Sequence, residues 1–134
     1  MGLTEGQIML ERFCRCWKDT GFEHLILANN RNTRDEMRET CQAAVSRGLK
    51  RVRAMTVSVH VPRTQEFATQ ACREFPGVSF HVEAAEDVLR RRYSNRPRCL
   101  EEIRTMKDSP CYARTAEPER RGLDALRSGN YGFC

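Results

Sequence analysis

Short apolar runs alternate with helix-start signals through the first two thirds of the chain. The runs HLILA (residues 24–28), RVRAMTVSV (51–59) and VSFHVE (78–83) have the character of buried or half-buried strands. Between them, apolar residues recur at helical spacing after residues 33 and 62. Strands that alternate with helices assemble most simply into a parallel sheet with helices on its faces. We therefore predict an α/β fold, a Rossmann-like three-layer sandwich with a short parallel sheet.

The chain opens on a helix signal, whereas doubly wound domains usually open on a strand. The pattern Thr4-x-x-Gln7 is a capping box and predicts a first helix over residues 5–19. A second capping box, Thr33-x-x-Glu36, predicts a helix with Thr33 as its N-cap. Because no strand precedes the first helix signal, we expect the first βαβ portion of the fold to be missing or to be supplied by another chain.

The last third of the chain carries mainly helical signals. Helices are expected over residues 85–93 and 99–106, a loop over 109–118, and a last helix over 118–127 that Gly129 ends. We divide the chain into a Rossmann-like domain of residues 1–95 and a C-terminal helical extension of residues 96–134 that packs on it.

Composition narrows the class of protein. Hydrophobic residues make up 40% and charged residues 31% of the chain, as in globular proteins. No apolar run approaches the ~20 residues that cross a bilayer, and the N-terminus lacks a secretory signal, so a cytoplasmic location is expected. The seven cysteines form no C-x-x-C pair. We therefore expect no metal site, and reduced thiols packed as small hydrophobic groups.

The net charge of +5 comes from arginine. One cluster comprises Arg90, Arg91, Arg92, Arg96 and Arg98. Such a cluster can attract phosphates, but it can equally be a solvated face or pair with the acidic residues upstream. Nucleic-acid binding ranks last among our hypotheses, because the chain lacks the aromatic strand motifs of common RNA-binding modules.

Polar residues follow two of the apolar runs, where an open α/β sheet binds its ligands. Asn32 and Thr33 could orient a polar group at a helix start, whose free N–H groups hold anions. Arg63 could make a bidentate contact to phosphate or carboxylate, and His60 could donate a hydrogen bond or relay a proton. In that case, changing both His60 and Arg63 to alanine should abolish ligand binding and leave stability nearly intact.

Each of these residues also has a structural interpretation. Thr33 is explained as an N-cap, and Asn32 as a residue that tolerates a turn conformation. His60 and Arg63 could instead hydrogen-bond loop carbonyls and hold the sheet edge together. Ser58 lies near His60, but no third orienting acid is identifiable, so the sequence indicates no triad. Both interpretations stay open at this point.

Two motifs together resemble a known family, the SanA/YdcF-like proteins of domain of unknown function 218. NRNTRDE, with Asn32 and Thr33, is similar to the family's S-x-N-T-x-E-N, and Asn30 stands where the family has serine. TVSVHVPRT is similar to its T-S-x-x-H-x-x-R-A, with Thr56, His60 and Arg63 in place. Upstream, TEGQIM is similar to the family's S-E-A-x-x-M, with Glu5 and Met9 in place. The resemblance covers roughly residues 4–88 and, more faintly, the C-terminal tail.

The resemblance implies a Rossmann-like domain that binds an anionic or nucleotide-like small molecule. An adenosyl-type ligand such as S-adenosylmethionine is one candidate, and no reaction is implied. The predicted ligand-binding residues are Asn30, Asn32, Thr33, Thr56, Ser58, His60 and Arg63. The alternative is a non-catalytic, truncated interaction module that self-associates through an exposed sheet edge.

Overall fold

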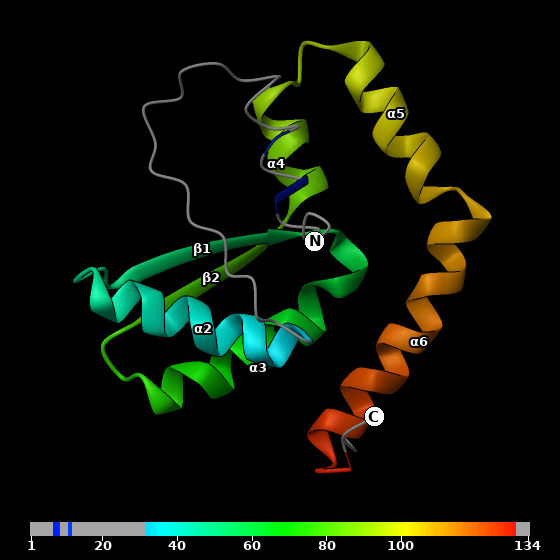
Figure 1. Cartoon of the computed structure of the whole chain (residues 1–134). Helices are drawn as coiled ribbons and strands as arrows, with labels where there is room; N and C mark the ends of the chain where they lie inside the picture. Colours follow the sequence, from blue (N-terminus) through cyan, green and yellow to red (C-terminus); the bar gives the residue numbers. More distant parts are fainter. Residues whose placement is uncertain (1–6, 9–10, 12–31, 131–134) are drawn as a thin grey trace.

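The computed structural model describes residues 7, 8, 11 and 32–130 of the chain (Figure 1). The strand expected at residues 24–28 and the predicted ligand residue Asn30 lie outside the described residues, as does most of the helix expected over residues 5–19. The elements are α2 (Thr33–Ser46), β1 (Arg51–Thr56), η1 (Ser58–His60), α3 (Val61–Glu74), β2 (Ser79–Ala84), α4 (Ala85–Arg92), α5 (Pro97–Lys107) and α6 (Pro110–Arg127).

Helix α2 begins one residue earlier than the capping-box pattern predicts. Asn32, not Thr33, is the N-cap: its backbone is extended, and its Oδ1 accepts a hydrogen bond from the Asp35 N–H at 3.0 Å. Asparagine is at least as good an N-cap as threonine, so Asn32 takes the role and Thr33 becomes the first helical residue. Gly48 follows the helix with a φ of 67°, the left-handed conformation that glycine adopts most easily.

The two described strands form the predicted parallel pair. Arg51 of β1 faces Ser79 of β2, and the register runs on to Thr56 opposite Ala84. Helix α3 is the crossover between them, and Pro62 stands in its first turn, where a missing N–H leaves no helical bond unmade.

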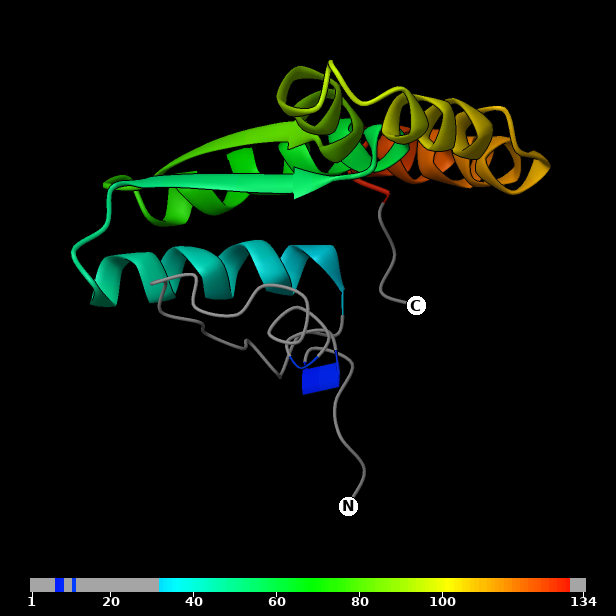
Figure 2. The same cartoon turned by 90° about the horizontal axis from the view of Figure 1, so that it is seen from above.

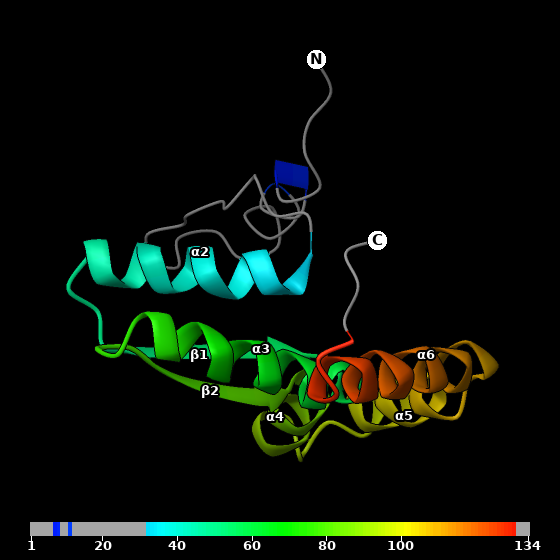
Figure 3. The same ribbon diagram turned by 90° about the horizontal axis from the view of Figure 1, so that it is seen from below.

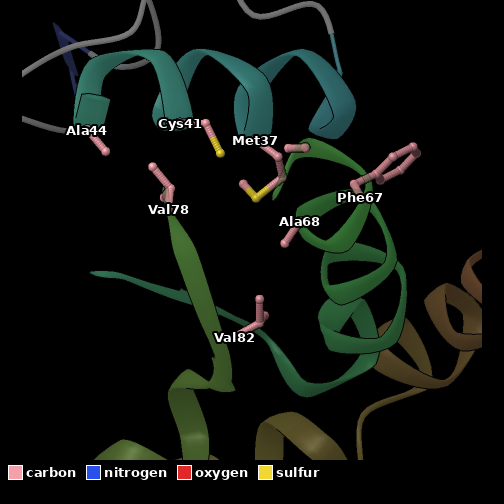
Figure 4. Close-up of a cluster of buried hydrophobic side chains, with 8 residues drawn as sticks. Met37, Cys41, Ala44, Phe67, Ala68, Val78 and Val82 are labelled. Carbon is pink, nitrogen blue, oxygen red and sulfur yellow. The ribbon is translucent and has the colours of Figure 1, made fainter. Parts of the chain in front are cut away.

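Helices α2 and α3 cover the same face of this sheet (Figures 1 and 3). Side chains of both helices and of β2 meet in a common apolar core (Figure 4). Its members are Met37, Cys41, Ala44, Phe67, Ala68, Ala71, Val78 and Val82.

Successive residues of β1 point to opposite faces of the sheet. Arg51, Arg53 and Met55 are exposed, while Val52 and Ala54 pack against the core. The described residues therefore form an α/β structure with a short parallel sheet and helices over one face. The Rossmann-like three-layer arrangement stays a prediction.

The prediction of a loop over residues 109–118 was wrong, because helix α6 begins at Pro110. Ser109 is its N-cap, with Oγ accepting from the Tyr112 N–H at 3.2 Å, and Pro110 is its first residue. Ser-Pro is thus a helix start here, in keeping with the preference for serine at N-cap and proline at N1. Pro118 lies inside the helix and removes one backbone hydrogen bond.

The C-terminal helices lie beyond the carboxyl ends of the two strands (Figure 2). Helix α6 contacts both α3 and η1, and α4 contacts β2 and α5. This arrangement places α6 beside the end of β1, where the candidate site lies. Among the described residues, no helix combines the length and the apolar character needed to cross a membrane.

Candidate functional site

A pocket of about 200 Å³ opens at the carboxyl end of β1, between the first turns of α2 and α3. Its lining residues are Thr33, Glu36, Met37, Ala54, Met55, Thr56, His60, Arg63 and Thr64. The end of a parallel strand, flanked by helix N-termini, is the position at which open α/β sheets bind ligands.

Four of the residues predicted from the sequence meet in this pocket. They are Thr33, Thr56, His60 and Arg63. Asn32 caps α2 and is not among the lining residues, and Ser58 takes part in a different cluster described below. The structure thus brings together the two polar turns that the sequence placed at separate helix starts.

The pocket wall combines hydroxyl groups, one carboxylate and an apolar side. Thr33, Thr56 and Thr64 carry the hydroxyls, and Thr64 is only 6% exposed. Glu36 lines the same space although its residue is largely exposed, and partial loss of water raises the pKa of its carboxyl. Met37 and Met55 supply apolar surface. Such a lining suits a small polar ligand with one less polar side.

Behind the pocket, His60 and Arg63 both meet Glu119 of α6. Arg63 Nη2 lies 2.8 Å and His60 Nδ1 3.0 Å from Glu119 Oε1. The His60 contact has the distance of an ion pair but makes no hydrogen bond, so Arg63 is the stronger partner. Glu119 is 8% exposed. A carboxylate this deeply buried requires a cation beside it.

Gly122 allows Arg63 to lie against α6. A Cβ at position 122 would stand 3.3 Å from Arg63 Nη1 and 3.5 Å from its Cδ. The first of these contacts is tighter than a side chain normally accepts, so the missing side chain leaves room for the guanidinium group. Arg63 is therefore fixed between the pocket and α6.

A second buried carboxylate, Glu86, organises the turn after β1. Its oxygens accept from the Ser58 N–H at 3.0 Å and from the Ser58 hydroxyl at 2.8 Å. The Tyr112 hydroxyl shares a hydrogen bond with the Ser58 hydroxyl and lies 3.5 Å from Glu86 Oε1. This cluster joins η1, α4 and α6.

The environment of Glu86 keeps it ionised. Burial alone would raise the pKa of this carboxyl, since the residue is 2% exposed. Hydrogen bonds from the Ser58 N–H, the Glu86 backbone N–H and the Ser58 hydroxyl outweigh burial and hold the pKa below its ordinary value. A carboxylate with a lowered pKa and several hydrogen bonds is suited to holding structure together and is a weak proton acceptor.

Glu86, Tyr112 and Glu119 were not predicted from the sequence as site residues. One signal was present on α6: Tyr112 and Glu119 are seven residues apart, and Leu123 and Leu126 continue the same helical face. The mistaken loop over residues 109–118 separated Tyr112 from the rest of this face. Glu86 had no comparable local signal, because Ser58 lies 28 residues before it.

The arginine cluster is partly neutralised by acidic neighbours. Arg91 Nη2 lies 2.6 Å from Glu83 Oε2, and Arg90 Nη1 lies 3.3 Å from Asp87 Oδ1. Arg96 stacks over the Tyr93 ring, 5.5 Å from its centroid. These pairings support the interpretation of this cluster as a solvated, internally paired surface.

Within the described ranges, no group of three or more histidine, cysteine, aspartate or glutamate residues could hold a metal ion. Comparison of the chain with protein-family models, curated proteins and solved structures gave no match. The likeness to the SanA/YdcF-like family therefore stays a prediction from short sequence motifs.

Proposed function

We propose that the chain is a Rossmann-like domain that binds a small molecule in the pocket at the end of β1. The ligand carries an anionic group, as phosphates and nucleotides do. The observation that carries the proposal is the pocket itself, whose lining joins Thr33, Thr56, His60 and Arg63. These residues come from two helix starts and one strand end.

The charge of Arg63 and the hydroxyl groups of the pocket lining favour an anionic ligand that can also accept hydrogen bonds from hydroxyls. Arg63 has five N–H donors, and Glu119 occupies one end of its guanidinium group. The positive end of the α2 dipole is directed toward the site. The Glu36 carboxylate opposes an anion, and its raised pKa reduces that opposition as the solution becomes acidic.

Size limits the part of the ligand that the pocket encloses. A volume of about 200 Å³ is below the roughly 300–1,000 Å³ of sites that enclose a drug-sized molecule. The pocket therefore suits a phosphate, a carboxylate or one ring of a nucleotide. An adenosyl-type ligand such as S-adenosylmethionine would extend beyond it.

Thr56→Val tests this proposal without disturbing the Glu119 ion pairs. Titration with inorganic phosphate, AMP and S-adenosylmethionine should shift the amide NMR signals of Thr33, Thr56 and Thr64 for at least one probe. Loss of one hydroxyl should then weaken the affinity for that probe about fivefold, the effect of one net hydrogen bond.

Thr69→Val is the matched control, because Thr69 is exposed on α3, outside the pocket lining. Its affinity should equal that of the unmodified chain. If none of the three probes moves the pocket signals, or if both variants bind equally well, the pocket is not the ligand site.

Self-association through a sheet edge is a second candidate function. It is supported by the sheet of the described residues, in which β1 and β2 pair only with each other. An unpaired strand edge offers backbone donors and acceptors to another chain. Light scattering after size-exclusion chromatography should then give a dimer mass, and a monomer at all accessible concentrations would contradict this candidate.

A further inference from the structure

The guanidinium group of Arg63 lies against α6, although Arg63 also lines the pocket. Its Nη2 forms the ion pair with Glu119 Oε1 at 2.8 Å. Its Nη1 lies beside Gly122, where a Cβ would stand only 3.3 Å away. Arginine binds phosphate and carboxylate most strongly through two parallel N–H donors. An anion in the pocket that takes both terminal nitrogens must therefore displace Glu119.

Glu119 holds Arg63 with only part of its hydrogen-bonding capacity. Its Oε2 is buried and, within residues 32–130, accepts no hydrogen bond. His60 Nδ1 lies 3.0 Å from Oε1 and is likewise without a hydrogen bond there. A buried acceptor without a donor is unfavourable, so this contact is weaker than that of a fully bonded ion pair. A ligand anion can therefore compete with Glu119 for Arg63.

The attachment of α6 to the rest of the structure depends on the same contact. Only two of the 18 residues of α6 are buried, Glu119 and Leu123. Helix α6 contacts α3 and η1, the elements that carry Arg63 and His60. Pro118, immediately before Glu119, removes one backbone hydrogen bond from the helix at this point. Loss of the Arg63 contact would leave one of the two buried side chains of α6 as an unpaired charge, so α6 should loosen from α3.

We propose that Glu119 competes with the anionic ligand for Arg63, so that a filled pocket releases α6 and a docked α6 weakens ligand binding. The inference rests on the proposed function, because it concerns the same pocket. In the chain without ligand, α6 is docked and Glu119 occupies the guanidinium group. When an anion binds, Arg63 turns toward it and Glu119 is released toward solvent. The coupling between pocket and helix is the same in both directions.

Titration of the unmodified chain and of Glu119→Gln with inorganic phosphate tests this competition. The affinity is followed through the amide NMR signals of Thr33, Thr56 and Thr64. Glutamine keeps the size of the side chain but removes the competing charge. Glu119→Gln should therefore bind phosphate at least about fivefold more tightly than the unmodified chain, the lower end of the usual coupling between two sites.

Glu117→Gln is the matched control, because it removes the same charge from the same helix. Glu117 is exposed, pairs with Arg120 at 2.8 Å and is not among the residues that line the pocket. Its affinity for phosphate should equal that of the unmodified chain. An equal gain in both variants would mean that phosphate responds only to the net charge of the protein, and would overturn the proposal.

Hydrogen exchange in the unmodified chain measures the release of α6 directly and does not depend on whether Glu119→Gln folds. Saturating phosphate should speed the amide exchange of residues 119–127, while the amides of residues 79–84 in β2 keep their rates. A ligand that only fills the pocket stabilises the folded chain and slows exchange. Faster exchange confined to α6 is therefore specific to its release.

Phosphate that moves the pocket signals but binds the unmodified chain and Glu119→Gln equally well would overturn the inference and leave the proposed function standing. Slower or unchanged exchange in α6 at saturating phosphate would do the same. Pocket signals that phosphate does not move in either protein would also overturn the inference. The proposed function would then be decided by AMP and S-adenosylmethionine.

Discussion

Replacing Glu86 with glutamine should lower the free energy of unfolding by about 3 kcal/mol. Glutamine keeps the size of the side chain but turns one acceptor into a donor. That donor then faces the Ser58 N–H or hydroxyl, both of which donate to Glu86 in the structure. Leaving such buried groups unpaired costs about 1–3 kcal/mol each, and more when a charge is involved. Urea denaturation of the two proteins at pH 7 measures the difference.

The same variant should change how stability depends on pH. The pKa of Glu86 is lowered in the folded chain. Its contribution to the free energy of unfolding is therefore fully present above the unfolded pKa of about 4.3. The contribution is lost as the pH falls from there through the folded pKa. The gap between the unmodified chain and Glu86→Gln should therefore narrow as the solution is acidified below about pH 4.3.

Asp87→Asn is the matched control for this experiment. Asp87 is the next residue on α4, lies in the same first turn, is exposed and pairs with Arg90. Replacing Asp87 should lower the free energy of unfolding by no more than about 0.5 kcal/mol. Equal effects of the two changes would mean that Glu86 acts only through the charge it adds to the start of α4.

Local signals were sufficient to predict the elements around the candidate site. The β-branched run before residue 59, Pro62 and the Pro76-Gly77 pair correctly predicted a strand, a crossover helix and the turn before β2. The parallel pairing of β1 with β2 was also correct. The rule that ligands bind beyond strand ends then pointed to Thr56 and Arg63, which do line one pocket.

The partners of these residues could not be predicted, because they come from distant parts of the chain. Tyr112 reaches Ser58 across 54 residues, and no periodicity within either segment indicates the other. Ser-Pro before α6 was interpreted as a loop signal, although the same pair can cap a helix. That error left the first turns of α6, with Tyr112, out of the predicted helix. Glu119 lay within the helix expected over residues 118–127, but no local pattern indicated that it faces His60 and Arg63.

The contact with Glu119 changes the loss of stability expected when Arg63 is replaced. From the sequence, Arg63 was either a ligand-contact residue, whose loss together with that of His60 leaves stability nearly intact, or a residue that holds the sheet edge together. In the structure, Arg63 is the main partner of Glu119, which is 8% exposed. Arg63→Ala should therefore lower the free energy of unfolding by about 2–3 kcal/mol, since a buried carboxylate left without its cation is strongly unfavourable. Urea denaturation at pH 7 measures this loss.

Arg73→Ala provides the control, because it removes the same side chain from an exposed position on α3 and should cost no more than about 0.5 kcal/mol. A double-mutant cycle with Glu119→Gln separates the ion pair from other contacts of Arg63. Once Glu119 is neutral, Arg63→Ala should cost about 1–2 kcal/mol less than it does in the unmodified chain. If instead Arg63→Ala and Arg73→Ala are equally mild, Arg63 does not hold α6, and its guanidinium group is free to serve the pocket alone.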